Sequence, residues 1–349
     1  MGSFSFYMST IAVYFGIDVL SAWSLNLQYG YGGVLNFGWI MFQAAGAYIA
    51  SVTVLGPSSS PNSYQSYVLG AHLPWPLPLL AAAAAGAVLA LVIGAFALRS
   101  IRRDYQAAVM LVLSLIATQV VSADPALFNG ANGLTGVTRP LFASLHISLP
   151  AYQWWYAVFV LLLCVPFYFF VEWLGKSSWG RALRAMRDHE QAAAAVGLNG
   201  TMLRLQVFVL GGAMAGLTGG LLVEFIGAWS PGAWGYSETL VLFTAILIGG
   251  VSNNRGVVLG TLLIPILVLQ VTQFLPQFGF TGLIDGLQWI LIGLAWMIGL
   301  LVRPRGIFPE RRLVERAPGS VTPTRRWFNG PSGHVLASGL TATEASDAR

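Results

Sequence analysis

The chain has 349 residues, of which 56% are hydrophobic and 9% are charged. Soluble globular domains carry about 25% charged residues and disordered chains are poor in apolar ones, so the composition excludes both classes over most of the length. The formal net charge is +5, and the single cysteine, Cys164, excludes an intrachain disulfide and a cysteine metal cluster.

Long apolar stretches follow one another along the chain. A helix needs about 20 apolar residues to cross a bilayer, and on that length we expect about nine spans, within a range of 8–10. The expected spans are residues 6–27, 36–55, 75–98, 105–122, 151–173, 203–226, 237–251, 256–275 and 284–302. Several run into glycine or proline, so we expect one or two to be broken or re-entrant. The sequence therefore predicts an all-α polytopic integral membrane protein, with a transmembrane domain at residues 1–302.

Basic residues gather in the loops that this topology places on one side of the membrane. They lie after residues 98, 173 and 251 and beyond residue 302, whereas the opposite side holds only Arg139. Because cytoplasmic loops carry an excess of Lys and Arg, we expect the C-terminus inside and the N-terminus outside. The positive charge then reflects topology, and we expect no nucleic-acid partner. The polar composition of residues 303–349 predicts a largely disordered cytoplasmic tail.

Polar residues interrupt the first two apolar stretches. Asn26, Gln28 and Asn36, with glycines such as Gly30 between them, can break the helix and expose backbone groups. Such groups survive at membrane depth only where protein or a cavity satisfies them, so we expect this segment to line a translocation pathway. Asp18 lies deeper in the first span, where a carboxylate is costly and often functional.

Glu224, in the span at 203–226, is the second deep carboxylate. A polar contact inside the bundle would account for both Asp18 and Glu224. The functional alternatives are a site for the amino group of a zwitterion and a proton relay in an ion-coupled secondary transporter. Glu238 lies close to a predicted span end, where water reaches it, and we set it aside.

Glycines recur every four residues in the same span, at Gly212, Gly216 and Gly220. In lipid, this spacing lets helix backbones approach closely. We expect simple helix packing here, with a sliding contact during gating as the alternative.

The predicted cytoplasmic loop at 175–204 carries a helical pattern of its own. Strong helix formers run from Gly180 to Gly197, where a glycine can end the helix. The arginines recur every three residues and share a face: Arg181, Arg184 and Arg187. Arg184 and Asp188 are spaced for an ion pair. The helix could lie on anionic headgroups or dock into a groove of another protein, and its small, alanine-rich apolar face favours docking.

The motif Gly175-Lys-Ser177 resembles the end of a phosphate-binding loop. The full pattern needs a glycine five residues before Gly175, but position 170 is Phe. We therefore expect no nucleotide site and no cofactor in this chain. The four histidines are scattered and form no visible cluster with carboxylates, so we do not expect an enzyme.

The segment 179–198, Trp-Gly-Arg-Ala-Leu-Arg-Ala-Met-Arg-Asp-His-Glu-Gln-Ala-Ala-Ala-Ala-Val-Gly-Leu, resembles the coupling loop of bacterial ABC-transporter permeases of the branched-chain amino acid class. Further blocks resemble the family in its own order, at 26–38, 97–105, 129–136, 248–260 and 303–306. The resemblance covers residues 10–306 and suits the longer of the two permease types of these systems. There are departures: Glu190 lies seven residues before Gly197 instead of six, and Trp39 stands where the family usually has a small polar residue or histidine.

The resemblance implies a permease subunit of an ATP-driven importer in the bacterial inner (plasma) membrane. Its substrates would be branched-chain or related hydrophobic amino acids, while relatives that carry urea, short amides or sugars supply the alternatives. It also implies a second permease subunit, expected to be a different chain, and two cytoplasmic ATPase subunits that bind ATP and Mg²⁺. An extracytoplasmic substrate-binding protein would deliver the substrate.

The same resemblance assigns two groups of residues. The ATPase-coupling loop would use Gly180, Arg181, Arg184, Arg187, Glu190, Ala192, Ala193 and Gly197. The outer face that receives the binding protein would include Asn129, Asn132 and Thr135, for which an ordinary capped turn is the alternative.

Overall fold

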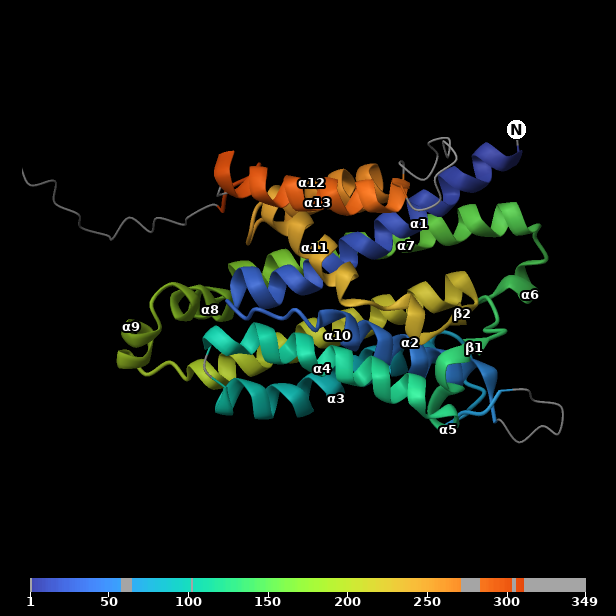
Figure 1. Cartoon of the computed structure of the whole chain (residues 1–349), viewed down its shortest axis with the longest axis horizontal. Helices are drawn as coiled ribbons and strands as arrows, with labels where there is room; N and C mark the ends of the chain where they lie inside the picture. The colour runs from blue at the N-terminus through green and yellow to red at the C-terminus, as the bar shows by residue number, and fades with distance from the viewer. Residues whose placement is uncertain (1, 58–64, 102, 271–282, 303–305, 311–349) are drawn as a thin grey trace, which may run out of the picture. The chain divides into compact units, whose positions relative to one another are not determined.

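The computed structural model describes residues 2–57, 65–101, 103–270, 283–302 and 306–310 (Figure 1). The longer helices are α1 (Gly2–Asn26), α2 (Trp39–Leu55), α3 (Leu77–Ser100), α4 (Arg103–Ala123), α7 (Leu149–Lys176), α8 (Ser178–Asp188), α10 (Gly200–Ile226), α11 (Tyr236–Gly249), α12 (Asn254–Thr261) and α13 (Leu283–Val302). The short ones are α5 (Pro125–Phe128), α6 (Phe142–Leu145), α9 (Glu190–Ala195) and the 3₁₀ turns Gly130–Asn132 and Pro231–Ala233. Two π-helical segments, Leu27–Tyr31 and Leu262–Gln270, continue α1 and α12.

Six helices in the described residues are long and apolar enough to cross a membrane. They are Ser5–Tyr31, Leu77–Arg99, Tyr105–Ala123, Leu149–Lys176, Gly200–Ile226 and Pro231–Gly249. The three other expected spans also meet apolar helices, at Trp39–Leu55, Asn254–Leu269 and Gly286–Gly299, but these have only 10–17 residues. The all-α membrane fold is thus confirmed, whereas the count of about nine spans is not.

The shortness of α2 has a local cause at each end. The chain leaves the helical path after Tyr31 and re-enters it only at Trp39. At the other end, Gly56 has φ +81, a left-handed conformation that stops the helix and that glycine adopts without steric cost. The expected break near the first two spans is therefore present, as a π-helical turn followed by irregular backbone.

Helix α10 lies at the centre of the bundle and contacts α1, α2 and α3 (Figure 1). Its ends are set by short-range chemistry: the Asn199 side chain accepts from the Met202 amide at 3.0 Å, and Gly227 ends the helix with φ +82. Helix α7 lies along α1, and α12 along α11.

Glycine makes the close approach of these helices possible. A Cβ atom added to Gly216 would overlap the carbonyl of Ala82 in α3, and one added to Gly219 would overlap the carbonyl of Gln43 in α2. From the α2 side, a Cβ on Gly46 would overlap the backbone of Gly216. The sequence prediction that the glycine spacing serves close helix packing is therefore confirmed.

A two-stranded antiparallel sheet joins the loop before α6 to the loop after α10. Strand β1 (Leu134–Thr135) pairs with β2 (Ala228–Trp229), with Leu134 opposite Trp229. Of the expected tail at 303–349, only residues 306–310 are described, and they lie against the turn between α11 and α12. The prediction of disorder concerns residues outside the described part.

Candidate functional site

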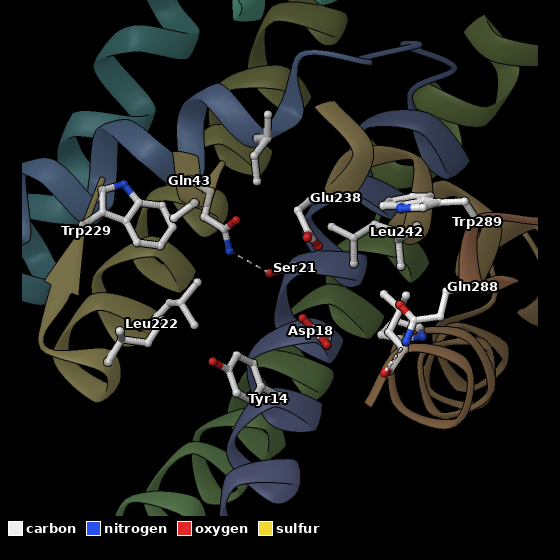
Figure 2. Close-up of a pocket in the computed structure, with 16 residues that line it drawn as sticks. Tyr14, Asp18, Ser21, Gln43, Leu222, Trp229, Glu238, Leu242, Gln288 and Trp289 are labelled. Atoms are coloured by element: carbon white, nitrogen blue, oxygen red, sulfur yellow. Dashed lines mark hydrogen bonds between the residues drawn. The ribbon is translucent and has the colours of Figure 1, made fainter. Parts of the chain in front are cut away.

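A cavity of about 420 Å³ lies among α1, α2, α10, α11, α13 and the π-helical segment that follows α12. Three of its polar residues, Tyr14, Asp18 and Ser21, follow one another at helical spacing and so share one face of α1. Gln43 from α2, Glu238 from α11 and Gln288 from α13 are the other polar lining residues. Figure 2 shows Gln43 and Glu238 turned toward the space in front of Ser21 and Asp18. The remaining walls are mainly apolar, with Leu222, Ile226, Trp229, Val241, Leu242 and Trp289 among them.

The charges in this cavity are of one sign. Its lining includes the carboxylates of Asp18 and Glu238, and no Arg, Lys or His is found among the described lining residues. The amide of Gln43 donates to Ser21 Oγ at 3.5 Å and to Thr218 Oγ1 at 3.4 Å, which leaves its oxygen free to accept. A ligand group rich in N–H donors, such as an ammonium, would find acceptors here.

The other expected pathway residues near the end of α1 lie outside this lining. Asn26, Gln28 and Asn36 are fully buried and bond to other parts of the chain. Asn26 accepts from the Ser252 amide at 3.0 Å, Gln28 donates to the Phe208 carbonyl at 3.2 Å, and Asn36 donates to Gln28 at 2.8 Å. The structure therefore places them in a buried polar network at the end of α1, outside the cavity lining. Their part in translocation stays a prediction.

The two deep carboxylates of the sequence analysis do not meet in one site. Glu224 is 1% exposed, one of its oxygens lacks a partner among the described residues, and it does not line the cavity that holds Asp18. Instead, the second carboxylate of the cavity that holds Asp18 is Glu238, for which the sequence predicts only a place near a span end. Helix α11 begins at Tyr236, so Glu238 lies in its first turn and faces α1 across the cavity. An acidic residue directly ahead of an apolar helical run is the signal that could have identified it.

The expected coupling loop folds as two helices, α8 and α9, instead of one. The Ser177 hydroxyl accepts from the Gly180 amide at 3.2 Å and caps α8, and His189 interrupts the helical path with φ −144 and ψ 81. Both predicted ends are therefore close to the observed ones, but the single helix is divided at His189.

The predicted coupling residues divide into exposed and inward-facing sets. The exposed set is Arg181, Glu190, Ala192 and Gly197. The set that is buried or half-buried against the bundle is Gly180, Arg184, Arg187 and Ala193. Val196, at 78% exposed, adds a large apolar side chain to the outer face. Glu190 also forms an ion pair with Arg204 at the start of α10, which anchors α9.

The arginines of α8 pair differently from the sequence expectation. Arg184 does not pair with Asp188; it donates to the Gly175 carbonyl at 2.8 Å and lies 3.8 Å from Glu310. Asp188 pairs with Arg187 at 2.8 Å. Burial lowers the pKa of the Arg187 guanidinium, but hydrogen bonds to Asp188 and Glu310 outweigh that effect and raise the pKa above its usual value.

The expected docking residues for a binding protein lie beside the small sheet. Asn129 has φ +63 and donates to the Gly133 carbonyl at 2.7 Å, so it stabilises its own turn. Asn132 is exposed, as is Thr135, whose amide donates to Gln65 at 2.9 Å. Their contact with another protein stays a prediction.

The chain is similar to known transport permeases over most of its length. A family model described as the permease component of the branched-chain amino acid transport system matches residues 7–301. The probable branched-chain amino acid transport permease protein LivM of Methanocaldococcus jannaschii is 25% identical over 334 residues, which cover 88% of this chain and 94% of that protein. The high-affinity branched-chain amino acid transport system permease protein LivM of Escherichia coli is 25% identical over 316 residues, which cover 85% of this chain and 68% of that protein.

A shorter match has a different substrate in its name. The fructose import permease protein FrcC of Rhizobium meliloti is 32% identical over 149 residues, or 42% of this chain and 39% of that protein. No solved structure matches the chain. Because the family model covers most of the sequence, including every helix of the cavity, the chain belongs to the family of branched-chain amino acid transport permeases.

Proposed function

We propose that this permease forms half of the translocation pathway of an ATP-driven importer for branched-chain or related hydrophobic amino acids. The observation that carries the proposal is the cavity inside the helix bundle, which combines carboxylates with an apolar wall. One face of the site offers acceptors for an amino group, and the other suits a hydrocarbon side chain.

In this proposal the cavity is a substrate site. Asp18 or Glu238 would accept hydrogen bonds from the substrate ammonium, and charge-assisted bonds of this kind are about twice as strong as neutral ones. Tyr14 lies in the same wall, as does Gln43, whose NH₂ group donates the two bonds given above. These two side chains would orient the backbone atoms of the substrate next to its ammonium group. Leu222 and the neighbouring apolar residues would contact the side chain.

The energy source and the partners complete the proposal. Two cytoplasmic ATPase subunits would bind ATP and Mg²⁺, and the exposed face of α8 and α9, with Ala192 and Val196, would dock against them. A second permease subunit, of which LivH-type relatives are the model, would supply the other half of the pathway. A binding protein would dock on the opposite side near Asn132 and Thr135. This arrangement requires the C-terminus in the cytoplasm and the N-terminus outside the inner membrane.

Labelled leucine uptake into right-side-out vesicles tests the proposal. The vesicles would contain this chain with its partner permease, ATPase subunits and binding protein, and ionophores would collapse all ion gradients. Uptake that requires both internal ATP and the external binding protein is the expected result. Uptake that requires an ion gradient instead would contradict it and favour a secondary transporter.

Competition in the same vesicles identifies the substrate. Excess unlabelled isoleucine or valine should abolish leucine uptake. The partial match to a fructose permease makes sugars the main alternative, so fructose, urea and short amides serve as competitors. If one of these, and not an amino acid, is itself accumulated with ATP, the substrate assignment is wrong while the importer assignment stands.

A further inference from the structure

The end of the bundle that contacts α8 contains a junction built around one arginine. The Arg187 side chain is 19% exposed, and each of its three nitrogens is bonded. Nη1 donates to the Gly30 carbonyl and, at 2.6 Å, to Ser252 Oγ; Nη2 donates to Glu310 at 2.8 Å; Nε donates to Asp188 at 2.8 Å. We call these five residues the Arg187 junction.

The Gly30 carbonyl is available because of the π-helical turn. After this turn the chain leaves the helix. The next amides donate to carbonyls that precede Gly30 in the chain: Gly33 to Tyr29 and Val34 to Gln28. A helix end leaves its last carbonyls without intrahelical partners. Here the Gly30 carbonyl accepts from Arg187 and, at 2.6 Å, from Ser252 Oγ. The broken end of α1 is thus held by α8 and by the turn between α11 and α12.

Glu310 reaches the junction from the far end of the described chain. The backbone amides of Ile307 and Phe308 donate to the carbonyls of Ile248 and Gly249 at 2.8 and 3.0 Å, so this segment is tied to the end of α11. Its carboxylate then bonds to Arg187 and lies 3.8 Å from Arg184. One carboxylate therefore holds two arginines of the predicted coupling helix.

The junction joins the two helices that carry the cavity carboxylates. Helix α1 carries Asp18 and ends near Gly30, and helix α11 carries Glu238 and ends at the turn that contains Ser252. Packed helices move as rigid elements, so a displacement of α8 would act on both through Arg187. We infer that Glu310 is a positioning residue for transport, which holds Arg187 against Gly30 so that motion of α8 reaches the α1 and α11 walls of the cavity. This inference rests on the proposed ATP-driven function.

The test compares transport with ATP hydrolysis in the reconstituted importer. Glu310→Gln keeps the shape of the side chain and removes its charge, and Glu310→Arg reverses it. Both should lower the amount of substrate transported per ATP hydrolysed by roughly fivefold or more, the lower end of typical coupling between distant sites. The conservative variant Glu310→Asp keeps a carboxylate that can accept from Arg187 and should retain more transport per ATP than Glu310→Gln.

A control comes from Arg255, a basic residue in the first turn of α12, shortly after Ser252 in the chain. Arg255 donates to the Tyr168 hydroxyl at 3.0 Å and takes no part in the junction, so Arg255→Ala should keep the wild-type ratio. If Glu310 only stabilises the fold, transport and ATP hydrolysis will fall together with the amount of folded complex and the ratio will not change; that outcome overturns the inference. If the wild-type importer itself shows no ATP-dependent uptake, the proposed function is refuted instead.

Discussion

Substitution of Gly219 by alanine should separate α10 from α2 and destabilise the protein. The added Cβ would overlap the Gln43 carbonyl oxygen and lie 2.8 Å from its carbon and 2.9 Å from the Ala47 amide nitrogen. All of these are backbone atoms, so no rotamer change relieves the contact. Overpacking of this kind costs about 1–3 kcal/mol, and the helix propensity of alanine returns about 0.5–1 kcal/mol. The two terms leave a net loss of about 1 kcal/mol, and at most about 2.5 kcal/mol, in the free energy of unfolding.

Gly293→Ala is the matched control. It makes the same chemical change within α13, where an added Cβ meets no atom within 4 Å. This variant should be as stable as the wild type or more stable by up to about 1 kcal/mol. The free energies would come from titration of the purified proteins with sodium dodecyl sulphate in mixed micelles, followed by circular dichroism. Equal stabilities of the two variants would refute the packing argument for α10.

The remaining predictions concern the cavity, a buried tryptophan and the outer face of the coupling loop. Asp18→Asn should raise the substrate concentration for half-maximal uptake; an unchanged value would indicate a packing role for Asp18. Trp39→Phe removes the 2.9 Å bond from the indole to Ser24 Oγ and should lower the stability to thermal unfolding by about 1 kcal/mol, with wild-type stability as the contradicting result. Val196→Asp should leave membrane insertion unchanged but prevent copurification of the ATPase subunits; normal copurification would exclude this face as their docking surface.

The membrane fold could be predicted from the sequence because its causes are local. Length and hydropathy identify spans without any tertiary information, and the glycine spacing in α10 specifies close packing whichever helix is the neighbour. Span completeness could not be predicted in the same way. The break before α2 lies beside two buried side chains whose partners are distant in sequence: Asn26 accepts from the Ser252 amide, and Gln28 donates to the Phe208 carbonyl.

The coupling loop shows where sequence periodicity stops being informative. The spacing of Arg184 and Arg187 correctly indicates a helix and a common face, but it cannot say what that face contacts. The partners Gly30 and Glu310 are 157 and 123 residues away from Arg187 in sequence. An arginine stripe on a membrane protein can face lipid headgroups, another subunit or its own bundle, and only the fold selects among them.

The placement of the carboxylates also bears on the choice between an ATP-driven importer and a proton-coupled transporter. A relay that used both deep carboxylates would need Asp18 and Glu224 within reach of each other through one polar cavity. The structure assigns them to different surroundings: Asp18 lines the cavity together with Glu238, whereas Glu224 is buried on α10 outside that lining. Asp18 and Glu238 instead line a space that also has an apolar wall. The substrate site proposed at Asp18 therefore accounts for this pair of carboxylates without any role for Glu224.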